Sequence, residues 1–474
     1  MSTYSSNPGQ YYRENLRVRE GLKNFSVPDE TWLQRVWFEE LYQSELKTLD
    51  GETIHILQPG FWNKSAGPDF FNACLINAAG EREIGAVEIH CRPQDWHAHD
   101  HEKNENYKDV VLHIFWECGS KEYFPKKPGA KAVRQVELKN QLRVPLESIQ
   151  AAWSASDDEL AVGARMGLCR RHVENLRDEE ISQLLYDAGW YRFRKKESAW
   201  RVRKAAMGYD QALWLGVAES LGYAKNKEAF RFLAQRLPIT ELKKQSVASN
   251  REALLFGLAG FLPERVLSPD KEEAEWPRTL WDIWWMERAE KMDLVLPKKC
   301  WNMAGLRPMN RPERRLAVLC LLASDWKRFS KLAAQGEPEA LIDYLTKLDH
   351  SFWSHHYTLK SKPIAQKAQL LGEGRIQALL FNVIWPLGNF EITKLSPWLS
   401  KQKTSEVNKS AKIAAVRLLQ SRALKKTCQT LLGSEGLIQI YQDFCAQDIS
   451  HCKECPFPKQ ISQWKSLKSL KDGF

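Results

Sequence analysis

The sequence lacks any long uninterrupted hydrophobic run. Its longest apolar stretches, at 316–323 and 378–387, fall well short of the roughly 18 residues that a membrane-spanning helix needs, and they suit buried helices instead. The first residues, MSTYSSNPGQYYRENLRVREG, contain no apolar core of a secretory signal. We therefore expect a cytoplasmic protein without a membrane-spanning segment.

Cysteine is also sparse, with 10 residues in a chain of 474. Cytoplasmic cysteines are normally reduced, so a disulfide framework is not expected. No fixed internal period recurs, which argues against a regular repeat solenoid. Hydrophobic residues make up 43% of the chain and charged residues 27%, and this composition excludes low-complexity and wholly disordered proteins.

Positive charge is in modest excess. The chain has 69 Lys and Arg residues against 59 Asp and Glu residues, which gives a formal net charge of +10. Such an excess is compatible with a polyanionic partner, and nucleic acid is the partner that we expect. The sequence does not fix the oligomeric state.

Changes of pattern divide the chain into four parts. Residues 1–28 are polar and predict a flexible arm, residues 29–150 an α+β domain, residues 151–425 a helical domain, and residues 426–474 a C-terminal helical segment with a cysteine cluster. We therefore predict an α+β N-terminal domain followed by a large, mostly α-helical region.

The α+β domain is predicted from a change of hydrophobic period. Residues 31–42 have helical spacing, with Asp29 or Thr31 as the cap. Short runs rich in β-branched and aromatic residues follow at 52–57, 70–76, 84–90 and 110–116. Beyond about residue 154 the strand patterns stop and amphipathic runs take over.

The most informative feature of the sequence is a set of two acids and one histidine. A strand that begins after Asp69 turns at about 78–80, and a second strand returns to Glu88. The midpoint between positions 69 and 88 falls inside this turn, so the two acids face each other in an antiparallel hairpin. His90 lies two residues beyond Glu88 and shares its side of the strand.

Two facing carboxylates repel each other unless a cation lies between them or one of them keeps its proton. We therefore expect Asp69 and Glu88 to bind a divalent cation, Mg²⁺ or Mn²⁺, at an acidic site. An imidazole in the shell favours Mn²⁺ or a later metal. The alternative is a pair of exposed strand-end acids with unrelated partners.

A histidine-rich segment, DWHAHDH at 95–101, follows the second strand. His97 and His99 are candidates for completing the metal shell or contacting a scissile phosphate, and for each a place in a polar surface loop is the alternative. For His101 we expect the polar surface loop. A further histidine, His113, lies inside the fourth strand.

The hairpin resembles the PD-(D/E)xK nuclease core, whose order is helix, three strands, helix and strand. Pro68 and Asp69 match the PD pair, and Glu88 matches the acid of the following strand. The resemblance implies that the acids hold a metal ion and that a lysine two positions on orients the attacking water. Here that position is His90, a departure, although a neutral imidazole can also hold or deprotonate water near pH 7.

The whole chain also resembles a bacterial family of proteins of unknown function, DUF2851. The segments that carry the resemblance include AGPDFFNA at 66–73, GAVEIH at 85–90, DWHAHDH at 95–101 and YKDVVLHIFWE at 107–117. Further segments are LLFGLAGFLP at 254–263, RPMNRPERR at 307–315 and the terminal cysteines. This resemblance covers about residues 32–456, and it implies no particular activity.

An arginine-rich segment opens into the apolar run at 316–323, and Pro312 fits the first helical position there. A helix N-terminus surrounded by arginines predicts a phosphate or nucleic-acid site. The alternative is a set of arginines that ties helices together through carbonyl groups. The candidate residues are Arg307, Asn310, Arg311, Arg314 and Arg315. A second basic stretch, at 191–204, predicts a face that follows a nucleic-acid backbone, or else a solvated helix face.

Three cysteines near the C-terminus have the spacing of metal ligands. Cys445, Cys452 and Cys455 follow the pattern C-x₆-C-x₂-C, which suits Zn²⁺ or an iron–sulfur cluster. This spacing resembles the first three ligands of the iron–sulfur loop in some DNA glycosylases, although no fourth cysteine follows. Cys428 and His451 are candidates for the fourth ligand, and reduced cysteines without a metal are the alternative.

These observations predict a divalent-metal-dependent phosphodiesterase, a nuclease-like hydrolase that acts on DNA or RNA. Asp69 and Glu88 hold the metal in this hypothesis, and His90 orients or deprotonates water with help from His97 or His99. A second hypothesis is a non-catalytic nucleic-acid-binding or scaffold protein on a degenerate nuclease fold, which His90 in place of lysine favours. A third, weaker hypothesis is a metal-dependent hydrolase of a small substrate.

Overall fold

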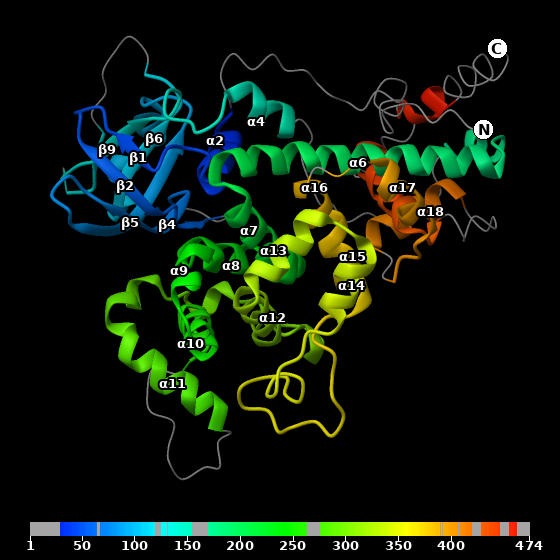
Figure 1. Ribbon diagram of the computed structural model, residues 1–474. Coiled ribbons are helices and arrows are strands. Elements are labelled where there is room, and N and C mark those ends of the chain that lie inside the picture. Colours follow the sequence, from blue (N-terminus) through cyan, green and yellow to red (C-terminus); the bar gives the residue numbers. More distant parts are fainter. Residues whose placement is uncertain are drawn as a thin grey trace.

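The computed structural model describes most of the chain, with short gaps. The described residues are 29–63, 67–118, 125–129, 131–153, 169–262, 275–388, 390, 392–405, 408–419, 428–445 and 455–461. The predicted N-terminal arm, residues 1–28, lies outside them. Figure 1 shows a sheet region at one end of the molecule and a large helical region beside it, as the change of period predicted.

The N-terminal region is built around one mixed sheet. Its elements are α2 (Glu30–Phe38), β1 (Glu45–Lys47), β2 (Thr53–Gln58), β3 (Phe61–Trp62), β4 (Phe70–Ile76), β5 (Arg82–His90), α3 (Asp95–Ala98), η1 (His101–Lys103), η2 (Glu105–Tyr107), β6 (Val110–Phe115), β7 (Lys126–Lys127), β8 (Lys131–Ala132) and β9 (Arg134–Glu137). The strand order is β1-β2-β4-β5-β6-β9, and β3 pairs with β4. The four predicted strands are confirmed, and β1, β3 and β9 extend the sheet.

The centre of the sheet combines an antiparallel hairpin with a parallel crossover. Strands β4 and β5 pair antiparallel, whereas β5, β6 and β9 are parallel to one another. The strands β5 and β6 approach closely at Gly85, where a Cβ atom would lie 2.6 Å from the carbonyl oxygen of Asp109. A side chain at position 85 would therefore push β6 away from β5.

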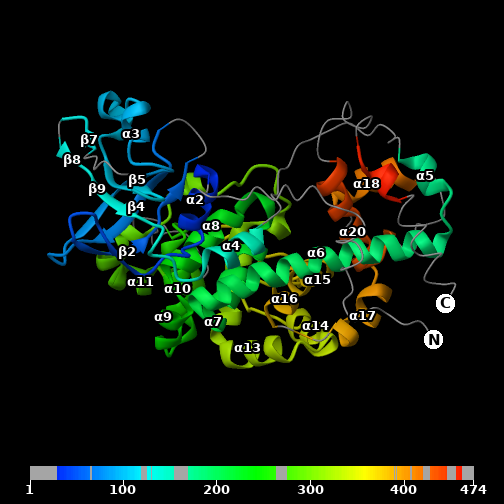
Figure 2. The ribbon, with the colours of Figure 1, turned by 90° about the horizontal axis from the view of Figure 1, so that it is seen from above.

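Helix α2 and the crossover cover opposite faces of the sheet. Asp29 caps α2 as predicted, because its Oδ1 accepts a hydrogen bond of 2.7 Å from the Trp32 main-chain N–H. The buried side of α2 contributes Val36 and Trp37 to the main hydrophobic core. Figure 2 shows α3 on the side of the sheet away from α7 and α9, where Trp96 and neighbouring residues form a small separate cluster.

The rest of the described chain is mostly helical, apart from an irregular segment between residues 347 and 372. Its elements are α4 (Leu146–Trp153), α5 (Arg170–Glu174), α6 (Asp178–Met207), α7 (Tyr209–Leu221), α8 (Tyr223–Arg236), α9 (Ile239–Lys244), α10 (Ala248–Leu258), α11 (Glu275–Glu287), η3 (Arg288–Leu294), η4 (Lys298–Cys300), η5 (Pro308–Asn310), α12 (Pro312–Ser324), α13 (Trp326–Gln335), α14 (Pro338–Thr346), α15 (Glu373–Leu379), η6 (Leu380–Ile384), α16 (Trp385–Gly388), α17 (Ile392–Lys401), α18 (Lys409–Leu419), α20 (Leu431–Ile440) and η7 (Tyr441–Cys445). Within these helices, none is long and apolar enough to cross a membrane.

Helix α6 connects the two hydrophobic clusters of the helical region. It is one continuous helix of 30 residues, where the sequence pattern indicated two separate amphipathic runs, at 179–186 and 198–207. Near its start, Leu184 and Leu185 pack in a cluster with α18 and α20. Further on, Phe193 and Trp200 join the main core that also includes the sheet. Figure 1 shows α6 running from beside α2 to the end of the molecule where α17 and α18 lie.

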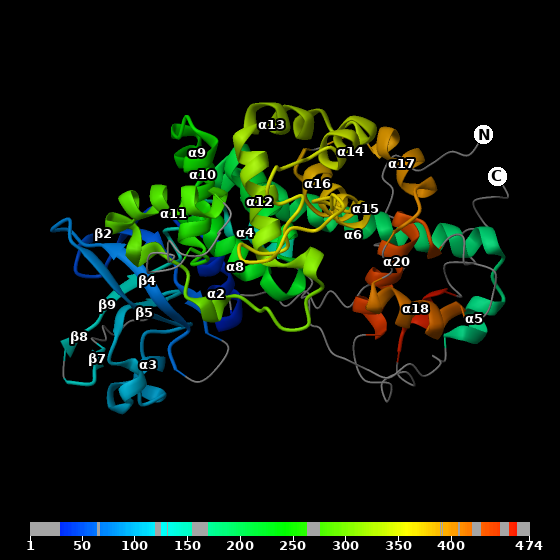
Figure 3. The same ribbon diagram turned by 90° about the horizontal axis from the view of Figure 1, so that it is seen from below.

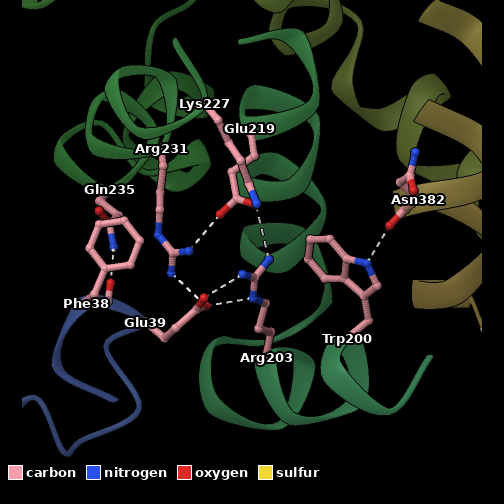
Figure 4. A network of polar contacts seen from close by, with 9 residues as sticks. All are labelled: Phe38, Glu39, Trp200, Arg203, Glu219, Lys227, Arg231, Gln235 and Asn382. Atoms are coloured by element: carbon pink, nitrogen blue, oxygen red, sulfur yellow. Dashed lines mark hydrogen bonds and ion pairs between the residues drawn. The ribbon is translucent and has the colours of Figure 1, made fainter. Parts of the chain in front are cut away.

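A buried network of two glutamates and two arginines joins α2 to the helical region. Glu39, which follows α2, binds Arg203 of α6 and Arg231 of α8, with N···O distances of 2.7 Å to each. Both arginines also bind Glu219 of α7, at 3.3 and 2.8 Å. Figure 4 shows this network, with the two guanidinium groups between the two carboxylates. We call it the arginine network.

Candidate metal centre

The predicted hairpin places Asp69 opposite Glu88. Phe70 pairs with Val87, so the residues just beyond them, Asp69 and Glu88, face each other. A bulge between Phe70 and Ala73 produces this alignment, because the register nearer the turn, with Ala73 opposite Gly85, would place Asp69 opposite Ile89. The two acids exchange contacts across the hairpin end. The Asp69 main-chain N–H donates to Glu88 Oε2 at 3.0 Å, and the Ile89 main-chain N–H donates to Asp69 Oδ2 at 2.9 Å.

Three side-chain donor atoms converge beside this hairpin end. Glu88 Oε1 lies 3.4 Å from His90 Nε2 and 3.2 Å from His101 Nε2, and the two imidazole nitrogens lie 3.3 Å apart. The three residues are 5%, 1% and 6% exposed. We call these atoms the donor triangle. The sequence predicted Asp69, Glu88 and His90 as neighbours, whereas the triangle itself contains His101 in place of Asp69.

His101 corrects the sequence-based expectation. It was predicted to lie in a polar surface loop, and this is wrong. The preceding residue, Asp100, has a left-handed backbone with φ of 55°, and this turn directs His101 inward. Its ring stacks on Tyr107 at a centroid distance of 3.9 Å and meets the edge of Trp96 at 5.3 Å.

The other two histidines of the segment at 95–101, His97 and His99, are exposed at the protein surface. His99 is exposed, and its ring centroid lies 5.1 Å from that of His90 and 5.4 Å from that of His101. One nitrogen from each of these three imidazoles falls within 4.8 Å of the others, so together they are spaced to hold a metal ion. His97 is directed elsewhere, because its Nδ1 lies 2.7 Å from Glu102 Oε1.

Further residues support the triangle without belonging to it. His113 Nε2 lies 3.0 Å from His90 Nδ1, and Gln135 Nε2 lies 3.4 Å from His113 Nδ1. On the other side, Gln34 Nε2 donates to Asp69 Oδ1 at 2.7 Å. Sequence reasoning missed Gln34 and Gln135, because no local pattern marks either residue as a partner of the site.

Glu30 is a third residue that sequence reasoning missed. It lies one turn before Gln34 on α2, and its carboxylate accepts a hydrogen bond of 3.4 Å from that side chain. Burial raises the pKa of Glu30, and the nearby His99 and His101 lower it in part. Glu30 therefore adds a third acid to the edge of the site.

The two hairpin acids are buried without a permanent cation. Burial, reinforced by the neighbouring Glu88, raises the pKa of Asp69 to about 8. Burial likewise raises the pKa of Glu88 to about 8. In the described part of the chain, these carboxylates contact Gln34, Ile89, His90 and His101 and the main chain of Asp69, and no lysine or arginine.

The buried imidazoles of His90, His101 and His113 have lowered pKa values. Burial, together with the neighbouring imidazoles, lowers the pKa of His90 to about 2 and that of His113 to about 3. Burial also lowers the pKa of His101. A neutral imidazole presents one nitrogen lone pair, which is the form that binds a metal ion.

The arginine-rich segment caps α12 as predicted, with Pro312 at the first position of the helix. The guanidinium of Arg314 is fully buried and binds four carbonyl groups, of Trp353, His356, Ala368 and Gln369. That of Arg315 binds the Leu370 carbonyl, Tyr223 and Asn310. These contacts match the alternative interpretation of the sequence, in which the arginines connect parts of the fold through carbonyl groups. The residues with this structural role are Arg314, Arg315 and Asn310. For the exposed Arg307 and for Arg311, which pairs with Glu313, a phosphate site stays a prediction.

The basic stretch at 191–204 belongs to α6, and several of its cations are used within the fold. Arg192 binds Glu435 at 2.7 Å, and Arg194 binds Glu197 at 2.6 Å. Arg203 belongs to the arginine network. These pairs leave less positive charge for a nucleic-acid backbone than the sequence indicated.

The C-terminal cysteines lie at the second hydrophobic cluster. Cys445 is buried in it, and Cys455 and Cys428 pack against it. Cys169, which the sequence reasoning did not consider as a ligand, belongs to the same cluster. Cys452 and His451 lie outside the described residues, so the metal site of the cysteines stays a prediction.

The comparisons with known proteins give a family and no activity. No curated protein and no solved structure matches the chain. The model of a family described as "Protein of unknown function (DUF2851)" matches residues 30–440, which include the sheet, the donor triangle and most of the helical region. The chain therefore belongs to the DUF2851 family.

Proposed function

We propose that this protein is a divalent-metal-dependent phosphodiesterase that acts on nucleic acid. The observation that carries the proposal is the convergence of Glu88, His90 and His101 beside Asp69, at a hairpin end where two buried acids have no lysine or arginine partner among the described residues. A divalent cation would relieve the repulsion between these acids. When bound, such an ion lowers the pKa of a bound water and stabilises charge on a phosphoryl oxygen.

The order of elements supports a nuclease-like core. The succession α2, β2, β4, β5, α3 and β6 follows the order helix, three strands, helix and strand, with the acids at the hairpin between β4 and β5, once the short strands β1 and β3 are counted as additions to it. Apart from these additions, the chain departs from that pattern in two respects. Helix α3 has only four residues, and His90 stands where the nuclease core has lysine.

The proposal assigns roles to the residues around the triangle. Glu88, His90 and His101 hold the cation. Asp69 positions Glu88 through its main-chain N–H, and its carboxylate is held in turn by Gln34 and Ile89. The exposed His99 lies on the solvent side of the triangle, where its imidazole can orient water.

A non-catalytic nucleic-acid-binding protein is the second candidate. The lysine that orients water in the nuclease core is replaced by His90, and burial keeps this imidazole neutral by lowering its pKa to about 2. A neutral His90 directed at Glu88 and His101 supplies no positive charge to a phosphate. This candidate predicts salt-dependent binding of nucleic acid without turnover.

The test is a cleavage assay with labelled single-stranded DNA, duplex DNA and RNA, supplied in turn with Zn²⁺, Mn²⁺ and Mg²⁺. We expect metal-dependent cleavage that falls at least about 100-fold in Glu88→Ala, because the charge-stabilising ion is lost. The matched control is Glu45→Ala, an exposed acid on β1 in the same sheet. Cleavage that survives Glu88→Ala would contradict the proposal, and binding without cleavage would favour the second candidate.

A further inference from the structure

We propose that the donor triangle is a zinc-type centre, with Glu88, His90 and His101 as three protein ligands and a fourth position open to solvent beside His99. This inference deepens the proposed function. It rests on that function only for the reaction that the bound ion would promote. It replaces the expected Mg²⁺ site between Asp69 and Glu88 with a site for a borderline transition metal. The argument has four steps.

The first step is the spacing of the donor atoms. They lie 3.2, 3.3 and 3.4 Å apart. Ligands at about 2.05 Å from a tetrahedral ion are separated by about 3.3 Å, which is this spacing. Adjacent ligands of an octahedral Mg²⁺ at about 2.05 Å are separated by only about 2.9 Å. The triangle therefore has the size of one face of a zinc tetrahedron.

The second step is the chemistry of the donors. Two of the three are imidazole nitrogens, which suit Zn²⁺ and later transition metals, whereas Mg²⁺ prefers oxygen ligands and retains several waters. Both carboxylate oxygens of Asp69 already accept hydrogen bonds, Oδ1 from the Gln34 side chain and Oδ2 from the Ile89 main chain. Asp69 is therefore not counted among the metal ligands. Two imidazoles and one carboxylate with an open position form a ligand set that catalytic zinc sites use.

The third step is the support of the ligands. His101 is buried, and its Nδ1 has no hydrogen-bond partner among the described residues, so the polar contacts of this ring are those of Nε2 with Glu88 and His90. Packing against Tyr107 and Trp96 holds the ring in place. Buried polar groups normally have hydrogen-bond partners, and those of His101 all belong to the donor triangle. The ring of His101 is therefore suited to act as a ligand in this triangle.

The relay behind His90 is the fourth step. His90 binds a metal through Nε2 only if its proton is on Nδ1, from which it donates to His113 Nε2. His113 then carries its own proton on Nδ1 and needs an acceptor at Gln135. A half-turn of the Gln135 amide brings its oxygen to that place, so His113 and Gln135 are positioning residues that set the tautomer of His90.

The fourth position of the centre lies on its exposed side. Three protein donors occupy one face of a tetrahedron, and His99 lies next to them, within 4.8 Å of the His90 and His101 nitrogens. Catalytic zinc sites keep a fourth position for water, whereas structural sites are closed by four protein ligands. The centre is therefore catalytic when water takes this position, and His99→Ala, which removes the one imidazole that could close it, should leave the Zn²⁺ stoichiometry unchanged.

The experiment measures metal binding without turnover. The full-length protein is stripped of metal and titrated with Zn²⁺, Mg²⁺ and Co²⁺, and each variant is checked for an unchanged far-ultraviolet circular dichroism spectrum. We expect Zn²⁺ to bind far more tightly than Mg²⁺. The Zn²⁺ stoichiometry should fall by one in His101→Ala and stay unchanged in His55→Ala, a matched exposed histidine on β2 of the same sheet.

Zinc that is held by the C-terminal cysteines remains in both variants and does not obscure this difference. Bound Co²⁺ should show the strong visible absorption of a tetrahedral site, and His101→Ala should lose that part of the spectrum. Gln135→Met should weaken Zn²⁺ binding by about 10- to 100-fold while the Co²⁺ spectrum keeps its tetrahedral form, since a positioning residue is removed and no ligand.

Two results would overturn the inference. One is an unchanged Zn²⁺ stoichiometry in both His101→Ala and the more conservative His101→Asn. The other is equal affinity for Zn²⁺ and Mg²⁺ in the unmodified protein. Zinc binding as expected but without cleavage of any nucleic acid would leave the centre in place and remove the proposed phosphodiesterase activity, so the two failures are distinguishable.

Discussion

The arginine network and the donor triangle both bury carboxylates, but they compensate the charge in different ways. In the network, Glu39 and Glu219 each contact two arginines, and although burial raises the pKa of both acids, the guanidinium groups hold it below the usual range, well below for Glu39. Beside the triangle, Asp69 and Glu88 contact no lysine or arginine among the described residues, and burial raises the pKa of each to about 8. The chain supplies its own cations to the first site and leaves the second to an external one.

The difference matches the positions of the two sites. The arginine network lies where α2 meets α6, α7 and α8, so it fixes the sheet against the helical region (Figure 4). The triangle lies beside the crossover after β5, where the ring of His101 packs against Trp96 of α3. Figure 3 shows α3 from below, on the side of the sheet away from α9 and α10. Buried carboxylates that are paired with arginines hold the sheet against the helices. Buried carboxylates without a cation destabilise the fold unless a metal ion binds.

The largest expected effect comes from breaking the arginine network. Arg231→Met leaves Glu39 and Glu219 with one guanidinium between them, and Arg231 is only 2% exposed. We expect the free energy of unfolding to fall by about 3–5 kcal/mol, because buried charge loses its partner. Urea unfolding measures the change.

The control for this variant is Lys227→Met. Lys227 lies 4.0 Å from Glu219 with a side chain that is 58% exposed, so its loss should cost less than about 1 kcal/mol. If Arg231→Met costs no more than Lys227→Met, the network does not stabilise the joint.

The second effect is a pH dependence of opposite sign in the two sites. The network's acids have lowered pKa values, so their contribution is present above about pH 4.5 and is lost as the pH falls. Asp69 and Glu88 keep protons in the fold that they lose on unfolding. The metal-free protein should therefore lose stability as the pH rises, by about 1 kcal/mol for each such acid between pH 7 and pH 8, where the acids begin to ionise in the fold.

Unfolding of the metal-free protein at pH 7.0, 7.5 and 8.0 measures this slope. Glu88→Gln should reduce it, since one titrating acid is removed, and Glu45→Gln on β1 should leave it unchanged. Saturation with metal should abolish it, because the bound cation replaces the protons. A metal-free stability that rises across this range would refute the view that the two acids lack a cation.

The smallest expected effect concerns Asp69 alone. Gln34→Leu removes the amide that donates to Asp69 Oδ1 at 2.7 Å. The ionised form of Asp69 then loses a hydrogen bond, its pKa rises further, and we expect a loss of about 1 kcal/mol that is larger at pH 8 than at pH 6. Thermal unfolding at both pH values measures the difference, and an equal loss at both would mean that Gln34 acts only through packing.

The hairpin itself could be predicted from the sequence because it depends on local information. The turn at 78–80 sets the register of the nearer pairs, which alone would place Asp69 opposite Ile89. The bulge between Phe70 and Ala73 shifts the register by one residue and brings Asp69 opposite Glu88, and this bulge was not predicted. The helical character of the second region was also predictable from its period. The exact length of α6 was not, because the charged residues in its middle interrupt the apolar pattern.

The rest of the site depends on contacts that leave no local trace. His101 is directed inward by one left-handed residue, Asp100, inside an irregular segment where hydrophobic period carries no information. The Gln135–His113 contact joins residues 22 positions apart, and the Glu39–Arg231 contact joins residues 192 positions apart. Such pairs are set by the packing of whole elements, which a single sequence does not reveal.

The length of helix α6 has a consequence for how the protein unfolds. Its 30 residues, about 45 Å at 1.5 Å each, place Leu184 in one hydrophobic cluster and Trp200 in the other. Neither hydrophobic cluster can unfold fully without exposing part of α6 to solvent. Amide hydrogens along the whole length of α6 should therefore exchange with solvent at similar, slow rates. The helix makes the two ends of the protein a single cooperative unit.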